Sequence, residues 1–349
     1  MKRYLLKRLL RTLLAAWGIV SIIFLLSRTL SVPQQLQSLS DNSGLSTPSA
    51  AEQQAAERQL IHRLGLDLPL FYITLEESVA TRHWRWHGAA NQYHVWFSSL
   101  MRGDLGHSYR DDSPVLETIG NALRYTLPLT LVAAVVAIGL AIQVSTWLAK
   151  PGRGRRTVLT TIYALDAVPL FVVASALLLL FANPDALLLF PAYGLGSQSS
   201  DESSLSALAD FAYHLVLPVV SLVMVSLPGL VVQLEAALQH ERGTDYATTA
   251  RAKGLSEAQV IWRHTFRNAL LPTLTLITEF LPSLVAGAVI VEMIFALPGM
   301  GLLLAEAAAT RDYPVLMGGV VLTTLVRLAA QLLTDWLYVQ ADPRIRLQA

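Results

Sequence analysis

Six long apolar stretches dominate this chain of 349 residues. Each is close to the roughly 20 residues that an α-helix needs to cross about 30 Å of hydrocarbon. They lie at residues 9–31, 125–149, 158–182, 214–237, 269–293 and 314–339. Charged residues make up only 15% of the chain, whereas soluble domains average about 25%. The sequence therefore predicts an all-α polytopic membrane protein with six transmembrane helices.

Lys and Arg are distributed unevenly among the segments that join these stretches. They are concentrated in 1–11, 150–157, 238–268 and 340–349, whereas 183–213 contains none and 294–313 contains only Arg311. Short loops that are rich in Lys and Arg stay in the cytoplasm. We therefore predict that both termini and the 238–268 loop are cytoplasmic.

The first stretch resembles a secretion signal, because basic residues precede an apolar run. The run is longer than the roughly 7–15 residues of a signal, and no small-residue cleavage site follows Leu30. We therefore interpret it as an uncleaved anchor. The predicted parts are the N-terminus with the first helix (1–31), a helical insert on the outer side (32–124), and a core with the other five helices (125–349).

The insert is predicted to contain helices at 47–64, 71–82, 92–101 and 114–123, because apolar residues recur there between Gly and Pro breaks. The cluster Arg82 to His87 has two interpretations. His83 and His87 would share one face of a helix and could bind a metal, although no third ligand is evident. Trp beside Arg is also typical of a membrane interface. We favour the interface and predict no metal site.

A polar segment, Asp245 to Pro272, lies between the fourth and fifth stretches. A helix is predicted from Tyr246 to Lys253, and Gly254 is suited to end it because glycine adopts left-handed dihedral angles. A second helix is predicted from Ser256, a suitable N-cap. The two helices form an elbow at Gly254, and its cationic and histidine residues require water. They are Arg251, Lys253, Arg263, His264 and Arg267.

The elbow string DYATTARAKGLSEAQVIWRHTFRNALLP resembles the cytoplasmic coupling loop of bacterial ABC importer permeases, in the B-type dipeptide/oligopeptide/nickel branch. Thr248 and Thr249 replace the Glu and first Ala of the wider family pattern, and His264, Phe266 and Arg267 replace its later Ile, Leu and Pro. These departures are typical of the peptide branch. Other resembling segments, in chain order, are RLGLDLPL, LMRGDLGHSYRDDSPVLETI, HLVLP, VEMIFALPGMGLLLAEAAATRDYP and DPRIR.

The resemblance implies a permease subunit of the bacterial inner membrane that forms half of a translocation pathway for peptides or a similar small solute. The implied partners are a homologous second permease, two ABC ATPase subunits, an extracytoplasmic solute-binding protein and membrane lipid. ATP and Mg²⁺ would be bound by the ATPase subunits. The implied ATPase-coupling residues are Asp245, Tyr246, Ala250, Arg251, Ala252, Lys253, Gly254 and Leu255.

Motifs for catalysis are absent from the sequence. There is no G-x-x-x-x-G-K-[ST], no H-E-x-x-H and no G-x-S-x-G. The chain has no cysteine, and its net charge of +1 predicts no nucleic-acid partner. We therefore expect no catalytic residue and no cofactor in this chain. Two alternatives remain at this point: a secondary transporter, and a membrane scaffold without ATPase partners.

Residues within or beside the stretches suggest a pathway. Glu279 and Arg327 lie deep in the fifth and sixth stretches, where an ionised group needs a partner or water. They could line the pathway or form a buried pair that only fixes helix register. Asp166 is a weaker candidate, and Pro282 would kink the fifth helix.

The 294–313 segment is predicted to contain a turn at 297–301 and a short apolar helix at 302–309. That helix could shape the outer mouth of the pathway or pack against a neighbouring subunit.

Overall fold

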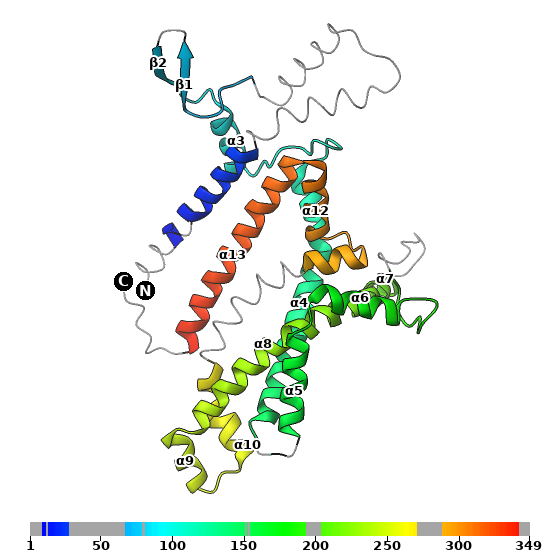
Figure 1. The fold of residues 1–349 in the computed structure, drawn as a ribbon. Coiled ribbons are helices and arrows are strands. Elements are labelled where there is room, and N and C mark those ends of the chain that lie inside the picture. Colours follow the sequence, from blue (N-terminus) through cyan, green and yellow to red (C-terminus); the bar gives the residue numbers. More distant parts are fainter. Residues whose placement is uncertain are drawn as a thin grey trace. The chain divides into compact units, whose positions relative to one another are not determined.

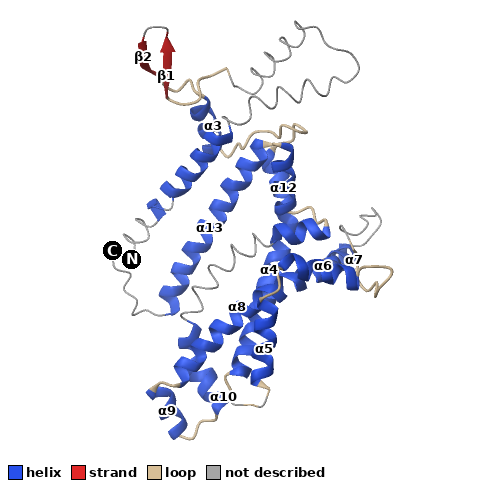
Figure 2. Cartoon of the chain, in the orientation of Figure 1, coloured by secondary structure: helices blue, strands red, loops and turns tan. Residues whose placement is uncertain are grey.

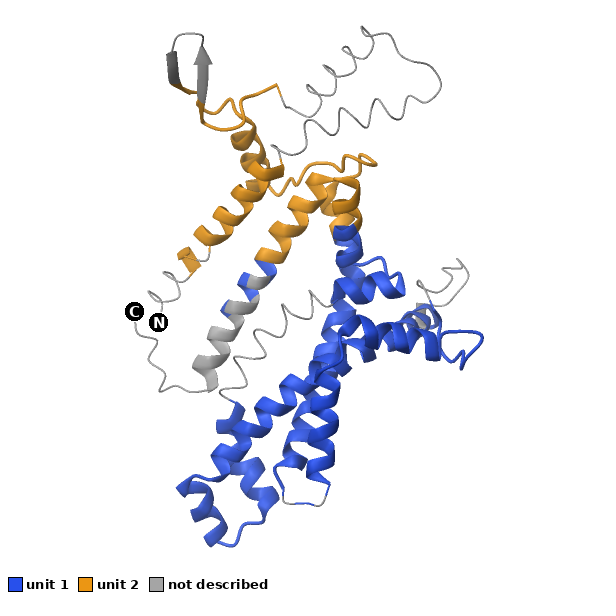
Figure 3. Cartoon of the chain, in the orientation of Figure 1, with its two compact units in different colours: residues 1–6, 120–305, 325–349 blue, residues 7–119, 306–324 orange. Residues whose placement is uncertain are grey.

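The computed structural model describes residues 9–11, 13–27, 67–78, 81–150, 152, 154–192, 204–270 and 288–341, and these are mostly helical (Figures 1 and 2). The chain separates into two compact units (Figure 3). Unit 1 comprises 1–6, 120–305 and 325–349, and unit 2 comprises 7–119 and 306–324. Each unit is described by itself.

Unit 1 is built around α4 (Val115–Leu148), most of which it contains, and α8 (Val216–Arg242). The other named elements that lie wholly or partly in it are α5 (Arg155–Asp166), α6 (Leu170–Phe181), α7 (Ser204–His214), α9 (Asp245–Ala252), α10 (Glu257–Val260), the π-helix η1 (Ile261–Thr265), α12 (Met300–Thr310) and the later part of α13 (Tyr313–Ala341). A further helix spans Ala288–Phe295.

One face of α4 carries small residues at a spacing of four. These small residues, Ala133, Ala137, Ala141 and Ser145, are all buried, as is Leu129 one step before them. The Ser145 hydroxyl donates to the backbone oxygen of residue 231 in α8 at 3.1 Å. Small residues let membrane helices approach closely. The opposite face exposes large apolar side chains, as expected for contact with lipid. These are Leu131, Val132 and Val135.

The third predicted stretch is not one straight helix. Helix α5 ends at Asp166, and α6 begins after Pro169 at 99° to it. Pro169 has an extended backbone and is the N-cap of α6. Because proline lacks an N–H, it cannot continue the preceding helix. Our prediction of a span over 158–182 is therefore corrected to a bent pair. The 183–213 segment, predicted as a loop, also contains α7.

Unit 2 contains the helix Leu9–Ser27, α3 (Gln92–Met101) and a hairpin. Phe24 stacks on Trp96 and meets Tyr93 edge to face. Helix α3 confirms the helix predicted at 92–101, and Asn91 caps it by accepting from the backbone N–H of His94.

The helix predicted at 71–82 is wrong. Strands β1 (Ile73–Ser78) and β2 (Thr81–Trp86) pair antiparallel there, with residue 73 opposite residue 86. A strand does not give residues 83 and 87 the shared helical face that our metal alternative required. Among the described residues no group of three possible metal ligands occurs.

A loop–helix contact in unit 2 joins two of the sequence segments noted above. The buried Ser108 hydroxyl donates to Asp312 at 2.5 Å, and the backbone N–H of Tyr109 donates to the same carboxylate at 3.1 Å. This contact ties the 102–114 loop to the start of α13.

The described residues contain three helices long and apolar enough to cross a membrane: Leu9–Ser27, α4 and α8. Two bent pairs, α5 with α6 and Ala288–Phe295 with α12, raise the count to five if each pair is one span. The predicted fifth stretch, 269–293, lies mostly outside the described residues. The prediction of six spans with both termini inside stays a prediction.

Candidate coupling site

Helix α9 ends as the sequence predicted, at a glycine with a positive φ. Gly254 has φ +83°. Its N–H donates to the carbonyl of Arg251 at 2.9 Å, and the N–H of Leu255 donates to the carbonyl of Ala250 at 3.3 Å. This pair of bonds is the Schellman arrangement. Leu255 closes it by packing on the small cluster of Ala247, Ala250 and Val260.

The second arm of the elbow begins at a capping box. The Ser256 hydroxyl accepts from the backbone N–H of Gln259, and the Gln259 side chain accepts from the backbone N–H of Ser256 at 2.9 Å. These two bonds satisfy N–H groups that a helix start leaves without partners. The predicted N-cap is confirmed, and α10 continues into the π-turn η1 before the helix resumes at Phe266.

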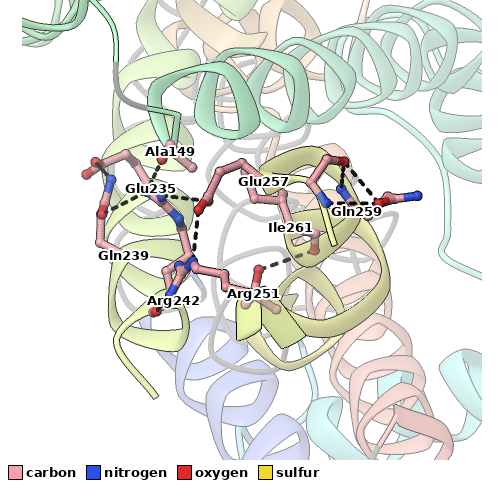
Figure 4. Close-up of polar contacts among 10 residues, drawn as sticks. Ala149, Glu235, Gln239, Arg242, Arg251, Glu257, Gln259 and Ile261 are labelled. Atoms are coloured by element: carbon pink, nitrogen blue, oxygen red, sulfur yellow. Dashed lines mark hydrogen bonds and ion pairs between the residues drawn. The ribbon is translucent and has the colours of Figure 1, made fainter. Parts of the chain in front are cut away.

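A carboxylate between two guanidinium groups holds the arms together (Figure 4). Glu257 accepts from Nη2 of Arg242 at 2.9 Å and from Nε of Arg251 at 2.8 Å. Arg251 also donates from Nη1 to the backbone oxygen of Arg242 at 3.1 Å, at the end of α8. We call these three side chains the elbow clamp. It joins the last residue of α8 to both α9 and α10.

The clamp reaches two further helices of unit 1. Arg242 donates from Nη1 to the backbone oxygen of Ala149, directly after α4. On α8, Glu235 accepts from Arg155 of α5 at 2.6 Å and from Gln239 at 3.1 Å. Arg242 also donates from Nη1 to the side-chain oxygen of Gln239 at 3.5 Å. Side-chain polar contacts therefore run from the elbow to the end of α4 and, through Gln239 and Glu235 of α8, to the start of α5.

Tyr246 fixes the exposed side of α9. Its hydroxyl donates to Glu241 and accepts from Nδ2 of Asn268 at 3.0 Å. Burial raises the pKa of the Tyr246 phenol, and the hydrogen bond to Glu241 raises it further. The phenol is therefore neutral and a donor at physiological pH.

Glu257 stays ionised in the clamp. Partial burial raises the pKa of its carboxyl, but hydrogen bonds from Arg242 and Arg251, together with their charges, outweigh this and leave the pKa below its usual value. The Glu257 carboxylate therefore carries a negative charge between two positively charged guanidinium groups over the physiological pH range.

The predicted coupling residues divide into an exposed group and an internal group. Ala250 is buried, while Arg251 and Leu255 are half-buried and make the contacts within the elbow that are described above. The exposed residues are Asp245, Tyr246, Ala252, Lys253 and Gly254, with Trp262 exposed on η1. Among the predicted coupling residues, the exposed ones are the most accessible to another protein.

Sequence reasoning missed two members of the clamp. The sequence pattern alone gives neither Glu257 nor Arg242 a role in holding the elbow together. The signal was the separation of Arg251 and Glu257, which lie six residues apart on either side of a helix-ending glycine. Such a turn folds the second arm back on the first.

The described residues do not test the predicted pathway candidates. Glu279 and Pro282 lie outside the described residues. Arg327 belongs to α13, and Asp166 is the exposed last residue of α5 at the bend. The pathway roles of these four residues therefore stay predictions.

Long apolar helices that pack through small residues, with a polar elbow after one of them, define a polytopic membrane protein. The chain belongs to the family of binding-protein-dependent transport system inner membrane components, whose model matches residues 141–347. Within that family it is a B-type permease of the dipeptide/oligopeptide/nickel ABC importer group.

Similar proteins cover most of the chain. The oligopeptide transport system permease AppB of Bacillus subtilis (strain 168) is 32% identical over 84% of this chain and 85% of its own length. The dipeptide transport system permease DppB of Escherichia coli (strain K12) is 31% identical over 82% and 84%. A solved chain of the MetNI methionine ABC transporter in an inward-facing conformation matches 64% of this chain and 96% of its own length, with 17% identity and a TM-score of 0.51. That likeness supports the fold.

Proposed function

We propose that this chain is a permease subunit of an ATP-driven importer of peptides in the bacterial inner membrane. It would form half of the translocation pathway, with a homologous second permease forming the other half. An extracytoplasmic solute-binding protein would deliver the solute. The relatives support the solute class, because several are named as dipeptide, di/tripeptide or oligopeptide permeases.

Two ABC ATPase subunits would bind ATP and Mg²⁺ and contact the elbow through its exposed residues, chiefly Tyr246 and Lys253. The observation that carries this proposal is the elbow clamp. It joins an exposed two-helix projection to the end of α8 through contacts of 2.8–3.1 Å. Arg242 of the clamp also donates to the backbone oxygen of Ala149, directly after α4, and Glu235 of α8 pairs with Arg155 of α5 at 2.6 Å. ATP can shift the pathway only as far as it binds its two states with different affinity. The elbow is the element through which that difference would pass.

Copurification tests the proposal. We expect the tagged full chain, extracted from membranes in mild detergent, to retain a second permease and two ATPase subunits, and its ATP hydrolysis to rise with a cognate binding protein. Ala250→Glu, which places a charge in the buried elbow cluster, should remove the ATPase subunits while the permease pair remains. Ala308→Glu, at an exposed position of α12 outside the elbow, is the control for adding a charge. A parent chain that never retains an ATPase would favour a scaffold, and vanadate-insensitive uptake would favour a secondary transporter.

A further inference from the structure

The segment 291–301, VEMIFALPGMG, lies outside the elbow and has no role in the contacts described above. It joins the helix Ala288–Phe295 to α12, and the two helices are bent by 82°. Residue 296 sits at φ +49° in the bend, and the backbone N–H of Leu297 donates to the carbonyl of Glu292 at 2.9 Å. A buried carboxylate lies at the centre of this bend.

Glu292 is fully buried and accepts three hydrogen bonds from neutral groups. Its Oε1 accepts from the Thr126 hydroxyl of α4 at 2.6 Å, and its Oε2 accepts from the backbone N–H groups of Gly301 at 2.6 Å and Leu302 at 3.2 Å. The Thr126 oxygen in turn accepts from the backbone N–H of Met300 at 2.8 Å. The first three N–H groups of α12 are thereby satisfied, and the positive end of its dipole faces the Glu292 carboxyl oxygens.

Two glycines make room for this contact. A Cβ at Gly299 would lie 2.2 Å from the Glu292 carboxylate. A Cβ at Gly301 would lie 2.3 Å from the Cα of Val289 and 2.9 Å from Glu292 Oε2. Glycine is therefore required at positions 299 and 301 by the approach of Glu292 and Val289 to the start of α12.

We propose that Glu292 and Thr126 form a latch that holds the start of α12 on α4, and that Glu292 is a positioning residue for transport. Burying an ionisable group is unfavourable unless its partners are already in place. In the part of the chain that the structure describes, the hydrogen-bond partners of the Glu292 carboxyl come from the two elements that the latch joins. This is the arrangement expected for a residue that fixes one element on another.

The latch lies on α4 far from the elbow, in the first half of the helix. Thr126 and the last residue of α4 are 22 positions apart, which at 1.5 Å per residue corresponds to about 33 Å along a helix, close to the thickness of the hydrocarbon core. If the elbow is cytoplasmic, the latch stands near the outer surface. Its consequence for transport rests on the proposed function, whereas its effect on α12 does not.

Thiol labelling tests the latch, because the chain contains no cysteine. Met300 is 4% exposed, so Met300→Cys in the full membrane complex should react slowly with a maleimide. Adding Glu292→Gln should raise the labelling rate about tenfold or more, since it removes a charged acceptor and turns an NH₂ toward backbone donors. Thr126→Val should raise it several-fold, and Thr126→Ser, which keeps the hydroxyl, should not. Ser145→Cys, fully buried elsewhere on α4, is the control for general loosening.

Unchanged labelling of residue 300 in both Glu292→Gln and Thr126→Val would overturn the latch. An equal rise in the labelling rate at residue 145 in both variants would also overturn the latch, because it would show that the two side chains stabilise the core in general. For the positioning role, we expect more ATP hydrolysed per solute imported in Thr126→Val, normal coupling in Thr126→Ser, and ATPase subunits retained in both. An open latch with unchanged coupling would refute that role. If no ATPase ever copurifies, the proposed function fails, and the labelling result still decides the latch.

Discussion

Glu257 and Glu292 are the same residue type in two different environments, one at the elbow and one at the latch. Glu257 has a side chain that is 39% exposed and is held by two guanidinium groups. Glu292 is fully buried and is held by two backbone N–H groups and a hydroxyl. Partly exposed ion pairs are individually weak and tolerate movement, whereas a buried carboxylate needs every donor in place. We infer that the elbow clamp can adjust as the elbow moves and that the latch is either closed or lost.

Gly301→Ala should have the largest effect. The new Cβ would meet the backbone of Val289, which cannot move aside as a side chain could. We expect a loss of about 3 kcal/mol, the upper end of the usual range for overpacking. Thermal unfolding in detergent measures it, with Gly139→Ala as control because nothing lies within 4 Å of a Cβ there. Equal stability of the two variants would contradict the tight packing at the latch.

Gly254→Ala should have a smaller effect at the elbow. Its φ of +83° is unfavourable for alanine, by about 1–2 kcal/mol. The control is Gly243→Ala at the other end of α9, where φ is −81°. We expect Gly254→Ala to lower the thermal stability and the amount of retained ATPase, and Gly243→Ala to change neither. Matching results for the two glycines would show that the left-handed turn is unimportant.

Glu257→Gln should change coupling more than stability. The loss of a partly exposed pair is expected to lower stability by less than about 1 kcal/mol, while uptake per ATP should fall because α8 and the elbow are less firmly joined. Glu306→Gln is the control, since Glu306 pairs with Arg110 at 3.6 Å on an exposed surface. Equal loss of uptake in both variants would remove the special role of the clamp.

The pH dependence of the clamp should be the smallest effect. The pKa of Glu257 is lowered on folding, so its stabilising contribution is present above the usual carboxyl pKa of about 4.5 and is lost as the pH falls through the lowered value. The melting-temperature difference between the parent and Glu257→Gln should be constant from pH 7 to about pH 5 and shrink in stronger acid. A difference that vanishes already near pH 6 would contradict the lowered pKa.

Much of the fold follows from local sequence. The apolar stretches at 125–149 and 214–237 correspond to α4 and α8, and 314–339 to α13, since each continuous run can only be buried or meet lipid. Gly254 and Ser256 were predictable as a helix end and a helix start because both act through their own backbone neighbourhood.

The remainder depends on pairing between distant residues. Thr126 and Glu292 are 166 positions apart, so no local pattern marks them as partners. The hairpin at 73–86 replaced a predicted helix because strand pairing, more than local propensity, decides such short segments. The sequence predicted one span over 158–182 and not the bend of 99° that interrupts it near Pro169.

Cross-linking from Lys253 tests the central claim most directly. With Lys253→Cys as the only thiol, a short bifunctional reagent applied to membranes should trap an ATPase subunit, and the yield should change when ATP is added. The exposed Thr310→Cys on α12 should trap none. Failure to trap an ATPase from residue 253, or labelling of that thiol from the outer face of intact cells, would contradict the elbow as the coupling element.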